Sequence, residues 1–216
     1  IVINSTSKYI NGNSSAISGV ITDAGRFKWD LERYPGMKDY KKFAKFAFTA
    51  KLRNGLFRNM GACMAPQTAY YNLLGMETLG LRMERVCNNA FRLAQALEKL
   101  EGVSVNYPLL ESSPYHELAE KQLSGKGGAI LTIRTGSKER AYKLINHLKY
   151  VKIATNIGDV RTLVIHPAST IYIHSTPEAM EEAGVYDDTI RISVGIEDIK
   201  DLIQDFTEAV ESLGEE

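Results

Sequence analysis

The sequence is poor in the features that mark secreted, metal-binding and membrane-spanning proteins. Cysteine occurs only twice in 216 residues, at Cys63 and Cys87, and without a C-x-x-C spacing. This usage argues against a disulfide framework and is typical of a reducing cytoplasm. The four histidines are scattered along the chain, so we expect no metal site. No apolar run is long enough to span a bilayer, so we expect no membrane partner.

The sequence also has no excess of positively or negatively charged residues. The chain has 26 lysines and arginines and 26 aspartates and glutamates, which gives a net charge of zero. Such a chain has no bulk electrostatic attraction to nucleic acid, and we expect no nucleic-acid partner. What is present is the composition of a globular protein, with 44% hydrophobic and 24% charged residues in a length that suits one or two domains.

The first residues are apolar, whereas a domain boundary usually lies in a polar and flexible linker. The run Ile1-Val2-Ile3 predicts the end of a buried strand, and no initiator methionine precedes it. We therefore expect the sequence to be the later part of a longer polypeptide.

One lysine near the start lies in an unusual setting. The stretch 4–15, NSTSKYINGNSS, places Lys8 among small hydroxyl residues. A buried lysine needs its charge matched or its amine used chemically, and hydroxyls are good partners for oxyanions. The pattern suits a lysine that holds an aldehyde cofactor as a Schiff base, with Ser5 and Ser7 donating to the cofactor's phosphate. A surface loop with one lysine has the same pattern.

The first half of the chain contains two helical patterns. Residues 26–42 are aromatic, charged and broken by Pro35-Gly36, which predicts loop and short helix. The lysines between 38 and 45 alternate with aromatic residues at helical spacing, which we interpret as a solvated face opposite a buried one. A longer pattern begins at Pro66 and runs to about Leu100, with a bend expected near Gly75 and Gly80. Cys87 lies on its apolar stripe, where core packing is expected.

Strands and helices alternate through the second half. Apolar stretches predict strands at 16–23, 103–105, 129–134, 152–155, 162–166 and 189–194. Helical spacing predicts one helix around Leu144 and a last one capped by Asp198. The segment from Pro108 to Lys126 is expected to be a long irregular connection. Together these elements predict an α/β fold that contains an α+β layer with helices on one face of a sheet.

Six stretches match the motifs of one family in order. They are 5–9 with Gly12, 81–85, 113–116, 156–159, 165–170 and 191–198. On these stretches the chain resembles the PLP-dependent trans-sulfuration enzymes of cysteine and methionine metabolism. Within this family the combination Asn-x-Gly-Asp and His-Pro-Ala-Ser-Thr is most similar to the O-acetylhomoserine sulfhydrylase branch. The family usually has threonine at the place of Ser7 and histidine or glutamine at the place of Asn13.

The resemblance implies the C-terminal part of a fold-type I PLP-dependent transferase. Residues 1–62 are expected to complete the large domain that binds pyridoxal 5'-phosphate, with Lys8 as the Schiff-base residue. Residues 63–216 are expected to form a long linking helix and a small α+β domain. The phosphate-gripping turn, the stacking tyrosine and the aspartate of the cofactor site are expected in an upstream half of the polypeptide.

The resemblance also implies roles for two residues of the second half. Arg191 is expected to bind the substrate's α-carboxylate, because a guanidinium offers two parallel hydrogen bonds. The other interpretation is an arginine at a strand end that pairs with an acidic neighbour. Asn156 is expected to donate to the same carboxylate, or else to be a turn residue. His166 is interpreted as structural, and the charged run 81–85 as pairing along a helix or as a subunit contact.

The function implied is γ-replacement on O-acetyl-L-homoserine by sulfide, which yields L-homocysteine and acetate for methionine biosynthesis. The alternative within the fold is elimination of the cystathionine or methionine γ-lyase type. The alternative from another class is a non-catalytic fragment or assembly module that lacks the N-terminal half of the site. The expected partners are an amino-acid substrate, a sulfur donor, the chain's own N-terminal half and three further copies in a cytoplasmic homotetramer.

Overall fold

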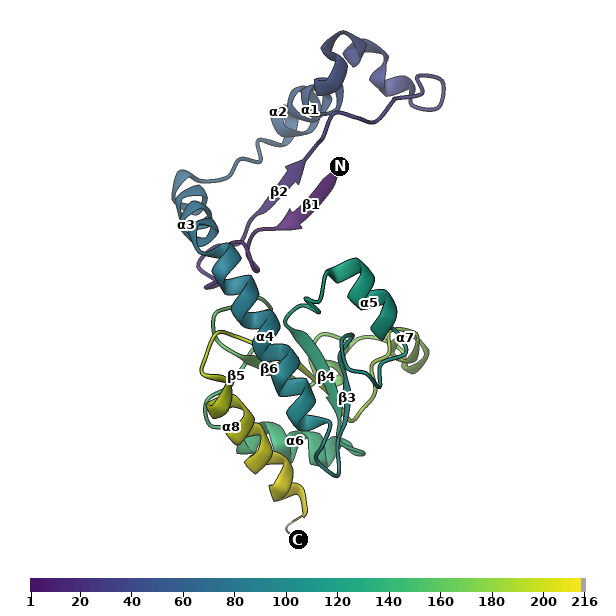
Figure 1. Ribbon diagram of the computed structural model, residues 1–216. Helices are drawn as coiled ribbons and strands as arrows, with labels where there is room; N and C mark the ends of the chain where they lie inside the picture. The colour runs from purple at the N-terminus through teal and green to yellow at the C-terminus, as the bar shows by residue number, and fades with distance from the viewer. Residues whose placement is uncertain (215–216) are drawn as a thin grey trace.

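The second half of the chain is built on a five-stranded sheet, seen in a computed structural model that describes residues 1–214 (Figure 1). Adjacent strands are antiparallel except β5 and β6, which are parallel. All five strands were predicted to within a few residues. Their order across the sheet is β3 (Ser104–Asn106), β4 (Ile130–Arg134), β7 (Thr189–Ser193), β6 (Leu163–Ile165) and β5 (Lys152–Ile153).

Three helices cover one face of this sheet, as predicted. They are α4 (Leu79–Leu97), α6 (Lys138–His147) and α8 (Ile199–Glu211). The register pairs Leu131 with Ile192 and Ile133 with Ile190, so these side chains point together into the core beneath the helices. The predicted cap of α8 is present, because the Asp198 side chain accepts from the Lys200 amide at 2.8 Å. We call residues 79–214 the body.

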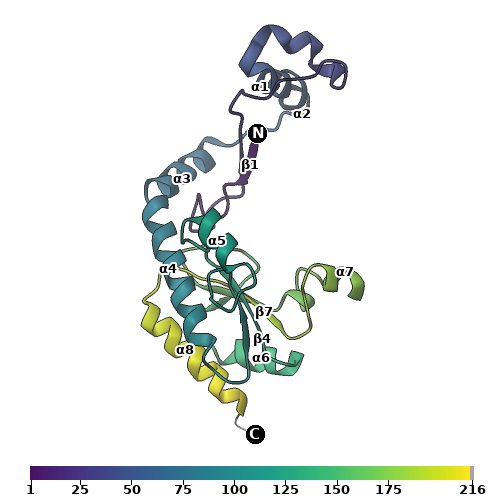
Figure 2. The ribbon, with the colours of Figure 1, turned by 45° about the vertical axis from the view of Figure 1, so that its right-hand side comes forward.

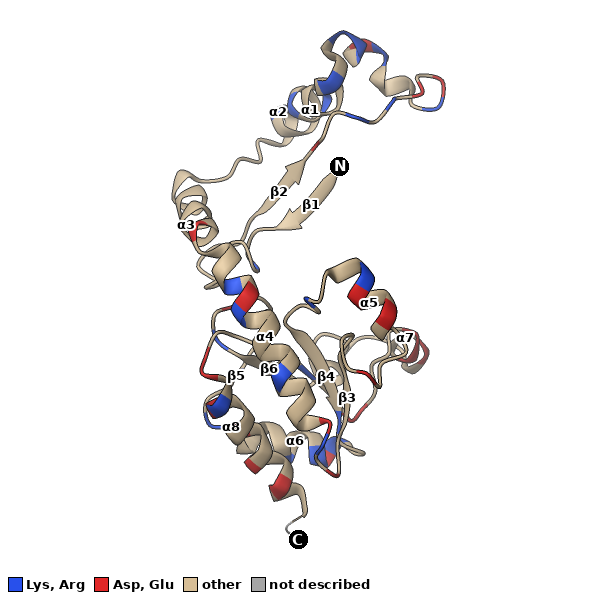
Figure 3. Cartoon of the chain, in the orientation of Figure 1, with Lys and Arg blue, Asp and Glu red and all other residues tan. Residues whose placement is uncertain are grey.

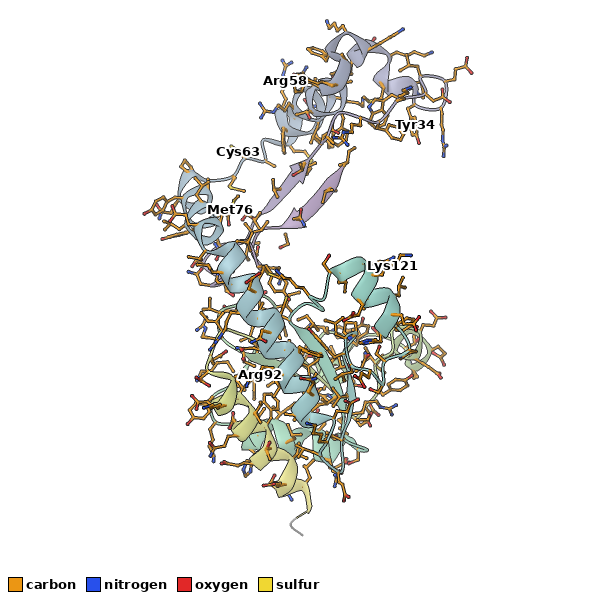
Figure 4. The ribbon with its side chains drawn as sticks, viewed as in Figure 1. Tyr34, Arg58, Cys63, Met76, Arg92 and Lys121 are labelled. Atoms are coloured by element: carbon orange, nitrogen blue, oxygen red, sulfur yellow. The ribbon has the colours of Figure 1, made fainter. Side chains whose placement is uncertain are left out.

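The helix predicted from Pro66 is divided in two. Helix α3 (Pro66–Glu77) ends at Thr78, and α4 continues in a different direction into the body (Figure 1). The buried thiol of Cys87 lies on the core side of α4, as expected. Cys63 is exposed on the connection that precedes α3 (Figure 4).

A hairpin and a helical segment extend from the body. Strand β1 (Val2–Ser5) pairs with β2 (Gly19–Thr22), and residues 24–62, which we call the arm, follow (Figure 2). Edge-on and stacked contacts gather Phe27, Tyr34 and Phe48 around Trp29. The arm's helical elements are 3₁₀ turns at Pro35–Phe46, α1 (Ala47–Leu52), a π turn at Arg53–Phe57 and α2 (Arg58–Met60).

The arm carries a strong positive charge that the whole-chain balance hides. Ten lysines and arginines stand against three acidic residues between 24 and 62, so the rest of the chain is negative by the same amount. Figure 3 shows blue residues gathered on the arm, whereas the red residues of α5, α7 and α8 lie in the body.

Two expectations of burial were wrong. The first strand forms, but Ile3 is 73% exposed, because the two-stranded hairpin leaves both of its faces uncovered within the described residues. The aromatic face opposite the arm's lysines is also open, and Phe46 is 60% exposed. Lys42 and Lys45 instead lie over the rings of Phe43 and Phe46 in cation–π contacts.

Two short helices were not predicted. The connection from Pro108 contains α5 (His116–Leu123), which buries Ala119 against the core. Helix α7 (Pro177–Glu182) begins at a Thr-Pro pair, whose threonine side chain accepts from the Ala179 amide. Over residues 1–214, no helix has the length and apolar character needed to cross a membrane. The same residues contain no cluster of three histidine, cysteine or acidic side chains that could hold a metal ion.

Candidate active site

The lysine loop, residues 4–15, is fixed to α3 by buried polar side chains. Asn72 of α3 donates to Thr6 Oγ1 at 3.3 Å and to Ser18 Oγ at 3.0 Å, and its own amide oxygen accepts from Asn11 at 3.3 Å. Thr6, Asn11 and Asn72 are all buried. Because buried polar groups are costly unless paired, this network specifies how the loop lies on the helix.

Gly75 and Arg82 hold the other side of the loop. A side chain at Gly75 would collide with the carbonyl oxygens of residues 10 and 11, so only glycine allows this approach. Arg82 donates to the Tyr9 carbonyl at 2.7 Å and to the Gly75 carbonyl at 2.6 Å. Arg82 also donates to the Thr78 side chain, four residues earlier, at 3.1 Å, so the expected pairing along the helix exists beside its contacts to the lysine loop. Glu84 pairs with Lys126 at 2.6 Å.

A second loop, residues 155–161 of the body, packs directly on the lysine loop. The Val160 amide donates to the Gly12 carbonyl at 2.8 Å, and the Gly158 amide donates to Ser193 Oγ at 3.1 Å. Gly158 has φ +73°, and a Cβ there would lie 2.7 Å from the Tyr9 amide nitrogen. Glycine is thus required both by the turn and by the close approach of the two loops.

The contact between these loops brings Lys8 and Asn156 together, although 148 residues separate them. Lys8 Nζ donates to Asn156 Oδ1. The other end of the amide, Nδ2, donates to Ser14 Oγ at 2.5 Å, and Ser14 Oγ donates to Asp159 Oδ2 at 2.6 Å. Arg161 in turn donates to Asp159 Oδ1 at 3.0 Å. A lysine amine is therefore held at the end of a continuous hydrogen-bonded chain.

Asp159 is ionised at neutral pH in this arrangement. Burial acts to raise its pKa, but hydrogen bonds from Arg161 and Ser14 outweigh burial and hold the pKa below the ordinary 3.8. The carboxylate is thus an acceptor at both oxygens.

Arg191 of β7 points away from the core helices and toward the same loops. Its Nη2 donates to the carbonyl of Thr155 at 2.8 Å and to that of Asn156 at 3.3 Å. Its Nε is buried and has no hydrogen-bond partner within the described residues. Burial lowers the pKa of the guanidinium below its usual value. A buried N–H donor without a partner costs about 1–3 kcal/mol, which a bound carboxylate or another anion would recover.

The two serines predicted for the phosphate lie on the same loop as Lys8. Ser7 Oγ accepts from the Ser18 amide at 2.9 Å and is 3.3 Å from the Ser18 carbonyl, while Ser5 is exposed at the end of β1. The structure thus places Lys8, Asn156 and Arg191 together, with Ser7 beside Lys8 in sequence. His166 is structural, as predicted, because its ring nitrogens contact Ser169 Oγ and the Asp187 carbonyl.

Sequence reasoning missed three neighbours of this site. Ser14 and Asp159 were not singled out, although the Asn-x-Gly-Asp motif contains one of them. Tyr9, the residue after the lysine, lines a small space together with Met83 and Val86 of α4. Burial raises the pKa of its phenol above the usual 10, as does Cys87, whereas Arg191 acts to lower it.

Comparisons with known proteins identify the family of the chain. The family model described as Cys/Met metabolism PLP-dependent enzyme matches residues 1–211. O-acetyl-L-homoserine sulfhydrylase 1 of Thermus thermophilus is 39% identical over 97% of this chain and 53% of its own length. An L-methionine gamma-lyase of Fusobacterium nucleatum is 36% identical over 99% of this chain and 49% of its own.

A solved structure gives the same result for the fold. A crystal structure described as an O-acetylhomoserine (thiol)-lyase from Campylobacter jejuni, containing a pyridoxyl-lysine phosphate, superposes with a TM-score of 0.90. It is 31% identical, and the match covers 97% of this chain and 53% of that one. The chain spans about half the length of the relatives it matches. The predicted family is confirmed: the chain belongs to the Cys/Met metabolism PLP-dependent enzymes.

Proposed function

We propose that this chain supplies the Schiff-base lysine and the carboxylate-binding side of an O-acetylhomoserine sulfhydrylase, acting together with an N-terminal half. The reaction is γ-replacement on O-acetyl-L-homoserine by sulfide, which gives L-homocysteine and acetate. The observation that carries the proposal is that Asn156 contacts both the Lys8 amine and Nη2 of Arg191, whose buried Nε has no partner among the described residues. An amine and an anion site this close suit an amino-acid substrate.

The residues fit pyridoxal phosphate as the cofactor. The Lys8 amine is the group that would bind the aldehyde, and the hydroxyls of Ser5 and Ser7 would donate to the phosphate. Arg191 would bind the substrate's α-carboxylate through its free donors, with the amide of Asn156 as a further donor. When bound, the cofactor supplies an electron sink for charge that develops at the substrate's Cα.

The chain's own contribution to the chemistry is proton transfer and orientation. Once its amine is free, Lys8 takes the proton from the substrate's Cα and returns protons later in the reaction. Arg191 fixes the carboxylate, and hence the direction of the Cα–H bond, during departure of acetate from Cγ and addition of sulfide. The relatives' names support the proposed substrate of the whole protein. We propose a cytoplasmic homotetramer and a domain boundary after residue 62 from the family resemblance.

The second candidate is elimination, supported by the match to a methionine gamma-lyase at 36% identity against 39% for the sulfhydrylase. The test uses the complete polypeptide that carries this chain, loaded with pyridoxal phosphate. O-acetyl-L-homoserine with sulfide should give homocysteine, and methionine alone should give little α-keto acid. Loss of homocysteine formation in Lys8→Ala, with the same thermal stability, is expected.

The opposite outcome would replace this proposal. If methionine or cystathionine is consumed and no homocysteine forms from O-acetyl-L-homoserine, the enzyme is a lyase. If neither reaction occurs and the complete polypeptide remains colourless with the cofactor, the non-catalytic alternative holds.

A further inference from the structure

The hydrogen-bonded chain that ends at Lys8 includes two residues, Ser14 and Asp159, that do not touch the lysine. It runs from Arg161 through Asp159, Ser14 and Asn156 to Lys8. Ser14 and Lys8 belong to the lysine loop and the other three members to loop 155–161, so the series is complete only where the two loops are packed together.

The donors and acceptors in this series of hydrogen bonds allow only one orientation of the Asn156 amide. An ionised carboxylate can only accept hydrogen bonds, so the Ser14 hydroxyl must donate its single proton to Asp159. Ser14 Oγ can then only accept from its other neighbour, which requires the NH₂ end of the Asn156 amide to face it. The carbonyl oxygen is left facing Lys8, where an amine needs an acceptor.

The backbone conformation of Ser14 also indicates that its side chain is held in one specific position. Its φ is +58°, in the left-handed region that non-glycine residues rarely adopt. Such a conformation is strained and persists only where its surroundings hold it. Here the hydroxyl's bonds to Asp159 and Asn156 hold it, although the side chain itself is exposed.

We propose that Ser14 and Asp159 are positioning residues for the catalytic lysine. They fix the Asn156 amide with its oxygen toward Lys8 Nζ, and so set where the amine lies when it exchanges a proton with the substrate's Cα. The kinetic part of this inference rests on the proposed function, because it takes Lys8 as the reacting amine. The orientation of the amide does not depend on that function.

The test compares three variants of the complete, cofactor-loaded protein. Ser14→Ala removes the hydroxyl, and Ser14→Gly removes it while relieving the positive φ, so that a folding defect cannot explain a shared loss. Ser15→Ala is the matched control, because its hydroxyl bonds only to the exposed Asn13 in the same loop. Both Ser14 variants should lower kcat by up to about 100-fold, as expected for a misplaced reacting group. The rise in KM for O-acetyl-L-homoserine should be a clearly smaller factor, although the same amide is proposed to donate to the substrate's carboxylate. Ser15→Ala should match the wild type.

A second measurement needs no turnover. In cofactor-free protein, the side-chain amide signals of Asn156 in a ¹⁵N–¹H spectrum report its hydrogen bonds. These signals should move in Ser14→Gly and Asp159→Asn, and stay in place in Ser15→Ala. The double variant Ser14→Ala/Asp159→Asn should lose no more kcat than the more impaired single variant, because both act through one amide.

The outcomes separate the two proposals. Unchanged Asn156 signals, or equal kcat in Ser14→Gly and Ser15→Ala, would overturn the positioning role whatever the reaction is. A fall in kcat that comes with an equal rise in KM would also contradict it, because that pattern belongs to substrate binding. Moved signals in a protein that makes no homocysteine would retain the amide orientation and reject only the proposed reaction.

Discussion

The body and the arm differ in how far they bury their large hydrophobic side chains. Phe206 of α8 is 0% exposed within a core of buried residues from three helices and the sheet, whereas Phe46 of the arm is 60% exposed. Figure 4 shows the arm's side chains, Tyr34 and Arg58 among them, far from those of the body. The body therefore contains its own source of stability, and the arm does not, within the described residues.

The candidate site draws on the body and on the lysine loop, which precedes the arm in the chain. The lysine loop supplies Lys8 and Ser14, and the body supplies Asn156 and Arg191. The buried side chain of Asn72 joins the lysine loop to α3. The contacts of Arg82 join the same loop to α4, at the start of the body. The lysine loop thus holds the reactive amine in place by packing on the body, which has a buried core of its own.

The largest effect is expected in the body's core. Phe206→Ala removes a fully buried ring and leaves a cavity, so the free energy of unfolding should fall by about 3–5 kcal/mol. Urea denaturation followed by circular dichroism would measure it. A loss below about 1 kcal/mol would mean that the body does not depend on this core.

A substitution at Arg191 tests whether the body contributes to substrate binding at the candidate site. Arg191→Ala should raise KM for O-acetyl-L-homoserine by about ten- to a hundredfold, because a charged hydrogen bond contributes about 1.5–3 kcal/mol. Steady-state kinetics of the complete protein would measure this. Arg134→Ala is the matched control, since this arginine of β4 pairs with Asp188 at 2.8 Å away from the loops and should leave KM unchanged. Equal KM in both variants would assign Arg191 a structural role.

Gly158 tests the packing of the two loops. Gly158→Ala puts a Cβ 2.7 Å from the Tyr9 amide at a positive φ, and should cost roughly 1–3 kcal/mol in stability while separating Lys8 from Asn156. Gly184→Ala is the control, because φ there is +66° but nothing lies within 4 Å of the added Cβ. Thermal unfolding and kcat should both fall more in Gly158→Ala than in the control. Equal losses would show that backbone strain alone, without the loop contact, accounts for the effect.

A smaller effect is expected on the pH dependence of stability. Because the pKa of Asp159 is lower in the folded chain than the unfolded value near 3.8, its contribution is complete above that value. The contribution is lost as the pH falls through the folded pKa. Wild type and Asp159→Asn should therefore converge in unfolding free energy below about pH 4. A constant difference between them from pH 7 to pH 2 would contradict the assigned shift.

The smallest effect is expected in the arm. Phe46→Ala should change the unfolding free energy of this chain by less than about 0.5 kcal/mol, because the ring is mostly in solvent. The same denaturation experiment as for Phe206→Ala gives the comparison. A loss as large as that of Phe206→Ala would remove the distinction between body and arm.

The elements of the body could be predicted because they depend on local patterns. The α4 stripe that contains Cys87, the strands and the Asp198 cap all follow from spacing within a few residues. Helix α5 was missed because its single buried residue, Ala119, gives almost no apolar period. The exposure of Ile3 could not be predicted, since an apolar strand residue looks the same whether or not another strand covers it.

The candidate site was predictable only where a motif carries it. Lys8, Asn156 and Arg191 were identified from family motifs, and the structure brings them together. Ser14 and Asp159 were missed because their hydrogen bond joins residues 145 positions apart and depends on the direction of one proton. Arg82 was assigned to its own helix because spacing does not show that the lysine loop, more than 70 residues away, offers it carbonyl oxygens.

The central claim is that Lys8 is the amine that carries the cofactor. Borohydride reduction of the complete, pyridoxal phosphate-loaded polypeptide, followed by proteolysis and mass spectrometry, tests it most directly. We expect the pyridoxyl phosphate mass on the peptide that contains Lys8 and its absence in Lys8→Arg. A label on another lysine, or none in a yellow protein, would contradict the account.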